Sequence, residues 1–380
     1  MVFGEHSLLQ LGPLAAGLGS RRALLVTDPG IVAAGHVERA RESLTAAGLA
    51  VAVFDQVREN PTTLDVARCV AALTAQGADL LVGLGGGSSM DTAKGANFIF
   101  TNGGEMRDYW GVGKASRPML PLIAIPTTAG TGSECQSAAL IAEDNTHQKM
   151  ACLDPKAAAR IAILDPVLTL SQPPRVAACT AIDALTHAVE TAVTTRRNAV
   201  SLMYSHEAFK QLIPAFPKVM ADPQDPVARG RMLLGAALAG MAIENSMLGA
   251  AHSAANPLTA HADLVHGQAV GLMLPHVIRF NAAGCPAARR AYAELASAPE
   301  IACVSEGLEQ AVEALVERVE ELLDLAGFPA SLADGGVDRA LIPVLAAEAA
   351  RQWTAQFNPR PIRTEDFVRL YEAAFEPRRP

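Results

Sequence analysis

Leu80-Leu-Val-Gly-Leu-Gly-Gly-Gly-Ser-Ser-Met-Asp-Thr-Ala-Lys94 joins a short apolar run to three glycines and the start of a helical segment. Glycines let backbone N–H groups approach a ligand closely, and a helix N-terminus favours an anion. The stretch fits the dinucleotide-binding pattern Gly-x-Gly-x-x-Gly only in part, because Ser88 stands at the third glycine position. It is not a Walker A loop, because Gly95 follows Lys94. We expect this turn to hold a pyrophosphate; the alternative is a glycine-rich turn without a ligand.

The same strand-turn-helix order repeats through the first half of the chain. Continuous apolar runs between helical segments are typical of parallel strands that are covered on both faces. The pattern therefore predicts an α/β dinucleotide-binding domain with a parallel sheet. Strands are expected at 23–27, 51–54, 80–84 and 122–125, and helices at 37–47, at 64–76 and from about 89 onward.

The character of the sequence changes after Pro166, beyond which it is almost entirely helical. A chain of 380 residues is long for a single core, so we expect two domains. We expect the first, 1–166, to be the dinucleotide-binding α/β domain, and the second, 167–380, to be an all-α domain and the candidate for binding metal and substrate. Residues 308–325 predict an amphipathic helix, and the apolar stretch 232–243 predicts a buried one, since a bilayer span needs roughly 20 apolar residues.

Composition excludes several classes of protein. Half of the residues are hydrophobic and the formal net charge is -8, which argues against binding to nucleic acid or to an anionic membrane. The N-terminal residues lack the basic segment and apolar core of a signal peptide. The six cysteines contain no Cys-x-x-Cys pair, which favours reduced thiols and a cytoplasmic location.

Two further polar positions follow predicted strands. The loop from Pro126 to Glu134 is rich in glycine and hydroxyl side chains, which suit a ligand site at a strand's carboxyl end. Asp28 follows the first of these strands and could accept hydrogen bonds from an adenosine ribose. A carboxylate there would repel a 2′-phosphate, which favours NAD over NADP. Asp28 reads equally well as a turn residue before Pro29.

Four side chains form a candidate metal site. Asp183 and His187 have an i, i+4 spacing, which places both on one face of a helix. His252 and His266 lie fourteen residues apart in the later sequence. One carboxylate and three imidazoles suit a divalent transition metal, and the absence of a thiolate favours a site with an open position. Taken singly, each histidine could be a core, turn or helix-end residue, and Asp183 could pair with an arginine.

These motifs, in this order, resemble the iron-containing (group III) alcohol dehydrogenases, and the resemblance covers nearly the whole chain. It implies a dinucleotide-binding domain and a helical domain, the architecture also found in dehydroquinate synthase. It implies Asp183, His187, His252 and His266 as ligands of Fe²⁺, or of Zn²⁺ in some relatives. The candidate cofactor-binding residues are Asp28, Asn60, Gly86, Gly87, Ser88, Asp91, Thr127, Thr128, Thr131 and Lys149.

The chain departs from this family at one position. Many members carry a second histidine four residues after the third ligand, where this sequence has Asn256. That histidine is thought to move protons or to contact substrate. We therefore include Asn256 and His261 as candidate catalytic residues. His261 reads more readily as a solvated loop histidine than as a substitute for the missing one.

The expected function is NAD(H)-dependent, metal-assisted hydride transfer between a small alcohol and its aldehyde or ketone. Polyol oxidation of the glycerol dehydrogenase kind is an alternative. A dehydroquinate-synthase-like lyase is a weaker one, because few basic residues lie between Asp183 and His276. A nucleotide-binding regulator without activity would have lost a metal ligand, and all four are present. A homodimer is the default for an oligomer.

Overall fold

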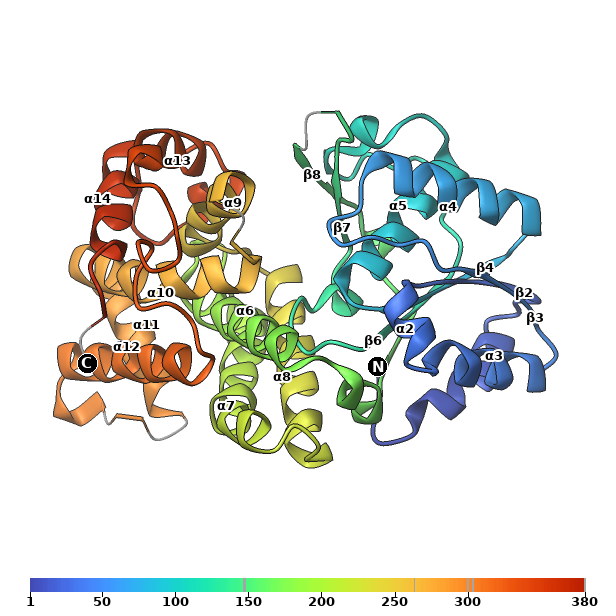
Figure 1. Cartoon of the computed structure of the whole chain (residues 1–380), viewed down its shortest axis with the longest axis horizontal. Helices are drawn as coiled ribbons and strands as arrows, with labels where there is room; N and C mark the ends of the chain where they lie inside the picture. The colour runs from blue at the N-terminus through green and yellow to red at the C-terminus, as the bar shows by residue number, and fades with distance from the viewer. Residues whose placement is uncertain (146–147, 263, 299–300, 303, 379–380) are drawn as a thin grey trace. The chain divides into compact units, whose positions relative to one another are not determined.

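The chain folds into an α/β unit followed by a helical unit. The computed structural model describes residues 1–145, 148–262, 264–298, 301–302 and 304–378. Its contacts divide into two units, Met1–Gln172 and Pro173–Pro380, and the sheet lies in the first of them (Figure 1). The division falls later than Pro166 because the turn η5 (Pro166–Ser171) buries Leu168 in the core of the first unit. The fold class agrees with the expectation from the sequence.

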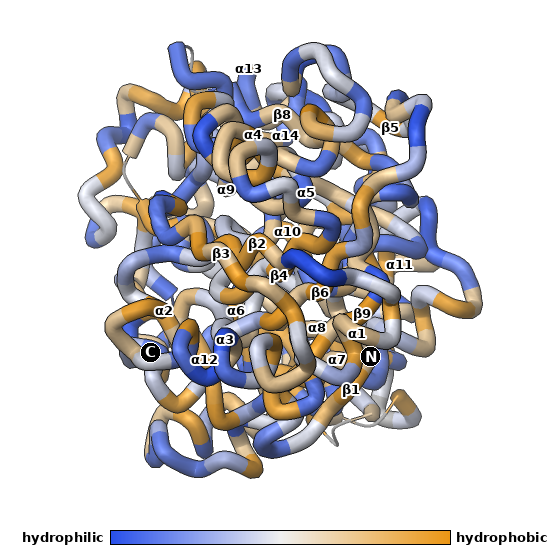
Figure 2. Tube along the Cα trace, turned by 90° about the vertical axis from the view of Figure 1, so that its right-hand side faces the viewer, coloured by the Kyte–Doolittle hydropathy of each residue, from blue (hydrophilic) through white to orange (hydrophobic). Residues whose placement is uncertain are grey.

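A six-stranded sheet forms the centre of the first unit, and all of its strands are parallel. The two middle strands are buried along their whole length, as the continuous apolar runs predicted. Figure 2 shows strands of this sheet as largely apolar stretches of the chain. The order is β1 (Val2–Phe3), β9 (Ile161–Leu164), β6 (Leu122–Pro126), β4 (Leu80–Gly85), β2 (Arg22–Val26) and β3 (Ala50–Phe54).

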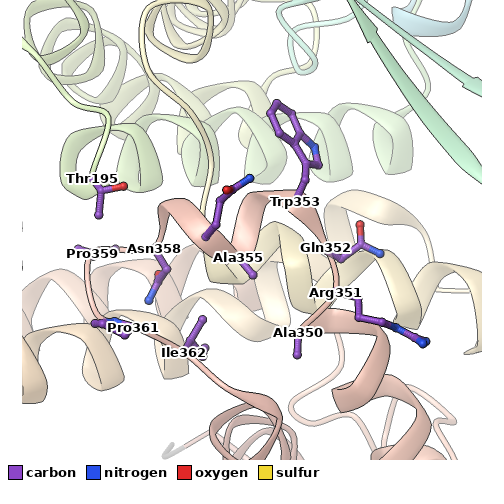
Figure 3. Close-up of a pocket in the computed structure, with 11 residues that line it drawn as sticks. Thr195, Ala350, Arg351, Gln352, Trp353, Ala355, Asn358, Pro359, Pro361 and Ile362 are labelled. Atoms are coloured by element: carbon purple, nitrogen blue, oxygen red, sulfur yellow. The ribbon is translucent and has the colours of Figure 1, made fainter. Parts of the chain in front are cut away.

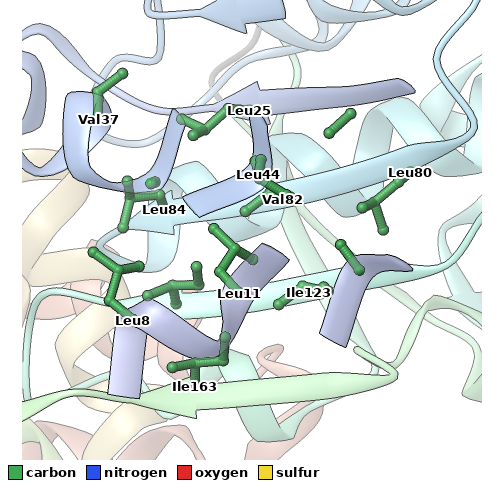
Figure 4. Close-up of a cluster of buried hydrophobic side chains, with 14 of the residues drawn as sticks. Leu8, Leu11, Leu25, Val37, Leu44, Leu80, Val82, Leu84, Ile123 and Ile163 are labelled. Atoms are coloured by element: carbon green, nitrogen blue, oxygen red, sulfur yellow. The ribbon is translucent and has the colours of Figure 1, made fainter. Parts of the chain in front are cut away.

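Helices pack on both faces of this sheet because alternate residues of each strand point to opposite sides. Leu25 of β2 joins a cluster with side chains of α1 (Leu11–Gly17) and α3 (His36–Ala46) (Figure 4). Its neighbour Leu24 joins a second cluster with side chains of α4 (Thr63–Gln76) and α5 (Gly87–Asn102). The short helix α2 (Pro29–Ala33) follows β2 directly. The sheet is thus the middle of three layers, which leaves the carboxyl ends of its strands for the loops.

A second, three-stranded sheet lies in the same unit and was not predicted. Its order is β5 (Gly111–Val112), β8 (Lys149–Leu153) and β7 (Ala138–Ala142), with β7 and β8 antiparallel. These strands are short, and β7 is rich in alanine, which has a low preference for strands. Their pairing, and not their composition, makes them strands.

The second unit is helical. Its helix α6 (Pro174–Val193) is apolar and long enough to cross a membrane by length and composition, but 89% of its most apolar stretch is buried, as is typical of a core helix. The predicted helix 308–325 coincides with α12. The other helices are α7 (Ala199–Ala221), α8 (Pro226–Glu244), α9 (Ala250–Ala262), α10 (His266–Gly284), α11 (Pro286–Ser297), α12 (Leu308–Leu325), α13 (Ile342–Ala349) and α14 (Thr364–Ala374).

Leu168 offers a test of where the first unit ends. Its side chain is fully buried in the α1–α3 cluster, so we expect Leu168→Ala to lower the free energy of unfolding by about 2–5 kcal/mol. Leu9→Ala is the matched control, because Leu9 is 67% exposed. Urea unfolding of both variants measures the difference. Equal stability of the two would mean that 167–172 does not belong to this core.

Candidate functional site

The glycine turn between β4 and α5 has a backbone that only glycine accommodates. Gly85 has a φ of +148°, and a Cβ at this position would collide with Ser89 Oγ. Gly86 is the N-cap of α5, and Gly87 is its first residue. The chain therefore turns sharply at the end of a buried strand and presents the first N–H groups of a helix.

The two loops predicted to bind the cofactor lie against each other. Their strands are neighbours, with Gly85 paired to Pro126, and the N–H of Thr127 donates to the carbonyl of Gly85 at 3.0 Å. A Cβ on Gly87 would lie 2.9 Å from Thr131 Cγ2, and one on Gly86 would lie 3.6 Å from Thr128. The glycine turn and the loop 126–134 thus form one surface at the carboxyl edge of the sheet.

This surface has the chemistry that a dinucleotide phosphate needs. The first N–H groups of a helix have no partner within the helix and attract anions. The buried Ser89 Oγ has no hydrogen-bond partner among the described residues. Small residues at the turn leave a backbone cradle that a Cβ would fill. The residues present therefore fit a pyrophosphate.

Asp28 has the turn role that its sequence context suggested, and its second oxygen lies near the glycine turn. Its Oδ1 accepts from the N–H groups of Gly30 at 2.9 Å and Ile31 at 3.1 Å, and so caps α2. Its Oδ2 lies 3.3 Å from where a Cβ on Gly85 would be. One oxygen of this carboxylate therefore caps α2, while the other lies close to the glycine turn between β4 and α5.

The remaining cofactor candidates lie in different environments. Asn60 is exposed and has a φ of 52°, in the left-handed region that asparagine tolerates better than most residues. Lys149 is exposed at the start of β8, and its charge acts on the Asp91 carboxylate. Ser88 is the second residue of α5 and is partly buried.

Asp91 is part of a buried network that the sequence did not predict. Ser133 Oγ donates to Asp91 Oδ1 at 2.8 Å, and Lys94 Nζ donates to Ser133 Oγ at 2.9 Å and to the carbonyl of Ala138 at 3.0 Å. Burial raises the pKa of Asp91, while Lys94 opposes that shift. Asp91 thus ties α5 to the end of the loop 126–134. Asp91 and Lys94 have an i, i+3 spacing, and this was the available sequence signal that both side chains lie on the same face of α5.

The candidate metal ligands converge in the helical unit. Asp183 and His187 lie one turn apart on α6, and His252 lies on α9. One nitrogen or oxygen from each residue forms a group whose atoms lie within 4.8 Å of one another. Asp183 Oδ1 is 3.4 Å from His187 Nε2 and 3.3 Å from His252 Nε2. All three side chains are buried.

His266, the first residue of α10, joins this group from its accessible side. Its Nε2 is 3.7 Å from Asp183 Oδ1, and its ring centroid is 5.5 Å from that of His252. The side chain is 34% exposed, whereas that of Asp183 is only 8% exposed. Three ligand candidates are therefore enclosed by protein, and the fourth borders solvent.

The electrostatics of the group agree with a cation site. Burial opposes ionisation of Asp183, but the imidazoles of His187, His252 and His266 hold the pKa of that carboxyl well below its usual range. Burial likewise opposes protonation of His252, but hydrogen bonds to Asp183 and Glu190 raise the pKa of His252 to about 9. The buried group thus stabilises positive charge beside Asp183. One oxygen and three nitrogen ligands fit a divalent transition metal.

Glu190 contacts this group but was not identified from the sequence. Its Oε2 lies 2.6 Å from His252 Nδ1, and its Oε1 accepts from the N–H of Ala251 at 2.7 Å. Glu190 follows Asp183 by seven residues, so both lie on the same face of α6. That spacing was the available signal.

The two candidates for the missing histidine lie in different places. Asn256 lies one turn after His252 on α9, and its Nδ2 donates to Gln352 Oε1 at 3.1 Å. His261 lies roughly two and a half turns beyond His252, on the opposite face of a regular helix. It is on a helix, and the expectation of a loop histidine is wrong. Its Nε2 is 2.9 Å from Glu348 Oε2 on α13.

A separate pocket of about 540 Å³ lies around η8 (Trp353–Phe357). Figure 3 shows Arg351, Gln352 and Trp353 along the segment that lines it. Gln352 is also the residue to which Asn256 donates. None of the four candidate metal ligands is among its lining residues.

Comparison with known families gives two matches that together span the chain. Residues 1–166 match the family described as "Iron-containing alcohol dehydrogenase". Residues 177–375 match "Fe-containing alcohol dehydrogenase family, C-terminal". The two matches fall one on each of the two units.

Characterised relatives and solved structures agree with these matches. The chain is 35% identical to lactaldehyde reductase of Escherichia coli K12, over 98% of this chain and 97% of the relative. It is 32% identical to the NAD-dependent methanol dehydrogenase of Bacillus methanolicus, with the same coverage. A crystal structure of 1,3-propanediol oxidoreductase superposes with a TM-score of 0.95 at 30% identity, covering 98% of this chain and 97% of the other.

Two neighbouring glycines provide a test of the glycine turn. An alanine Cβ at 87 would press on Thr131 at 2.9 Å, whereas one at 86 would meet Thr128 at an ordinary 3.6 Å. We expect Gly87→Ala to cost about 1–3 kcal/mol of unfolding free energy. Gly86→Ala should cost clearly less. Thermal or urea unfolding measures both, and equal losses would contradict the packing of the two loops.

Metal affinity should depend on pH in a defined direction. A ligand nitrogen must lose its proton to bind metal, and the metal-free site holds a proton on His252 with a pKa of about 9. Raising the pH towards 9 removes that proton and strengthens binding. Lowering the pH should weaken binding by up to about tenfold per unit for each proton displaced. Zn²⁺ or Co²⁺ titration between pH 9 and pH 5 measures this, and a flat profile would contradict imidazole ligation.

Proposed function

The chain belongs to the iron-containing alcohol dehydrogenase family, and from this we propose that it interconverts a small alcohol and its aldehyde or ketone with NAD(H) and a divalent metal. The observation that carries the proposal is the convergence of Asp183, His187 and His252 on one buried point. The relatives named above act on small alcohols and aldehydes, which supports the same substrate class here.

The metal would be held by Asp183, His187, His252 and His266. When bound, a divalent ion supplies Lewis-acid stabilisation of the substrate oxygen. Asp183, His187 and His252 are buried and would shield this position from water. The partly exposed His266 would leave an open side for substrate. Iron and zinc both suit this ligand set, and the family name favours iron.

The glycine turn would hold NAD(H). The backbone of Gly86, Gly87 and Ser88 would bind the pyrophosphate, with Ser89 Oγ and Thr131 beside it. Asp28 faces the same turn and would accept from a ribose hydroxyl while repelling a 2′-phosphate. NAD would therefore be preferred to NADP, and the name of the methanol dehydrogenase relative gives NAD as the cofactor of that enzyme.

Asn256 would orient substrate and not relay protons. An amide does not change its protonation near neutral pH, and its Nδ2 is already committed to Gln352. His261 pairs with Glu348 on another face of α9. Neither residue therefore replaces the family's histidine as a proton carrier, and solvent at the exposed His266 side would supply the proton.

We also propose a cytoplasmic location and a homodimer. Cys69, Cys152 and Cys285 are free thiols in the described part of the chain, and Cys303 lies outside it. Free thiols are typical of reducing compartments. The dimer rests only on the prevalence of twofold oligomers.

An NADH-oxidation screen over short aldehydes, including polar and anionic ones, tests the activity on anaerobically purified protein. We expect His266→Ala to lower turnover by at least about 100-fold, since it removes a metal ligand, while NAD binding stays largely intact. His206→Ala on α7 is the control, because this histidine lies in neither site. Unchanged turnover in His266→Ala would refute the role of the metal group.

A further inference from the structure

Glu190 holds His252 from the side opposite to Asp183. The ring lies between two carboxylates, with Nε2 at 3.3 Å from Asp183 Oδ1 and Nδ1 at 2.6 Å from Glu190 Oε2. Both carboxylates come from the same face of α6, seven residues apart. One helix therefore supplies both contacts to a ring that another helix, α9, carries.

The second oxygen of Glu190 fixes the backbone of the same element. Its Oε1 accepts from the N–H of Ala251, which is in the first turn of α9 and has no partner within the helix. A Cβ on Gly249 would lie 3.1 Å from this oxygen, so glycine at 249 allows the backbone before α9 to approach Glu190 closely. Glu190 thus positions both the ring of His252 and the backbone that bears it.

The hydrogen bond decides which nitrogen of His252 faces the metal position. An ionised carboxylate can only accept a hydrogen bond, so the ring proton that points at Glu190 must be on Nδ1. The lone pair of a neutral ring is then on Nε2, the nitrogen that faces Asp183 and His187. A histidine that binds a metal through one ring nitrogen usually donates the N–H of its other ring nitrogen to a carboxylate, a carbonyl or water.

The charge of Glu190 also needs a partner. Its side chain is 4% exposed, and among the described residues the ion pairs of Glu190 include His252 but no lysine or arginine. In the metal-free protein a protonated His252 ring can balance this charge. A ring that binds metal through Nε2 is neutral, and a buried carboxylate without a compensating positive charge is costly. A divalent cation beside Asp183 would then balance the charges of Asp183 and Glu190 together.

We propose that Glu190 is a positioning residue of the metal centre, which fixes the Nε2-ligating tautomer of His252 and neutralises the bound cation. The proposal rests on the proposed function, because it requires that the group binds a divalent metal. The competing view is that Glu190 only caps α9, through Ala251. The two views differ in whether loss of the carboxylate changes metal affinity or only stability.

Glu190→Gln separates these views. Glutamine keeps the size of the side chain and an oxygen that can accept from Ala251, but its amide can donate to Nδ1 and so place the ring proton on Nε2. We expect the affinity of the full-length, metal-stripped protein for Co²⁺ and for Zn²⁺ to fall about 10–100-fold. The visible spectrum of the Co²⁺ form should also change, which the loss of a helix cap alone would not cause.

Glu348→Gln is the matched control. It removes the carboxylate from the other hydrogen-bonded histidine–glutamate pair of α9, His261 with Glu348, whose side chains are about one-third exposed. We expect metal affinity equal to that of the parent protein. A Glu190→Gln protein with unchanged Co²⁺ and Zn²⁺ affinity and an unchanged spectrum would overturn the proposal, and leave only the capping role.

A measurement on the unmodified protein keeps the inference testable if Glu190→Gln does not fold. With ¹⁵N-histidine labelling and Zn²⁺ bound, NMR should find the proton of the His252 ring on Nδ1 and the metal on Nε2. A proton on Nε2 would overturn the proposal. If the unmodified protein binds neither ion, the proposed function fails; if it binds them but Glu190→Gln binds equally well, only the present inference fails.

Discussion

The buried carboxylate of Asp183 is the constraint on which the helical unit depends. Removing a carboxylate from water costs several kcal/mol unless positive charge or hydrogen bonds compensate. Here the compensation comes from three imidazoles on three helices, so α6, α9 and α10 must meet at one point. Gly267 permits this approach, because a Cβ there would collide with the backbone carbonyl of Cys179 on α6. The residue next to the candidate ligand His266 is therefore small for a packing reason, and the approach of His266 to Asp183 follows from the contact between α10 and α6.

In the first unit, the packing of buried strands and a buried polar network support the glycine turn. Parallel strands that are buried on both faces bring their carboxyl ends to one edge, and the loops after β4 and β6 meet there. Glycines at the turn allow the backbone itself to be the ligand surface, while Asp91, Ser133 and Lys94 hold the loop from beneath. A rigid, buried support below a small-residue surface suits a cofactor whose position must be accurate for hydride transfer.

Much of this arrangement could be predicted from local patterns. Four of the six strands of the main sheet, the helix 308–325 and the placement of Asp183 and His187 on one helix face follow from patterns within a single element. The other two strands of this sheet, β1 and β9, were not predicted. The small sheet could not be predicted, since β7 and β8 become strands through their mutual pairing. Glu190 stood at a helical spacing from Asp183, but its importance depends on Ala251 and His252, which are about sixty residues away. For His261 the residue type suggested a role near the metal group, but this side chain lies on the face of α9 opposite to His252 and pairs with Glu348.

The metal content of the anaerobically purified protein tests the central claim most directly, when it is measured on the parent protein and on Asp183→Asn. Asparagine keeps the shape of the side chain but removes the charge that the three rings surround. The account predicts about one divalent ion per chain in the parent and almost none in the variant, with NAD binding retained in both. A variant that kept its full complement of metal, or a metal-free parent protein that reduced aldehydes at an undiminished rate, would contradict it.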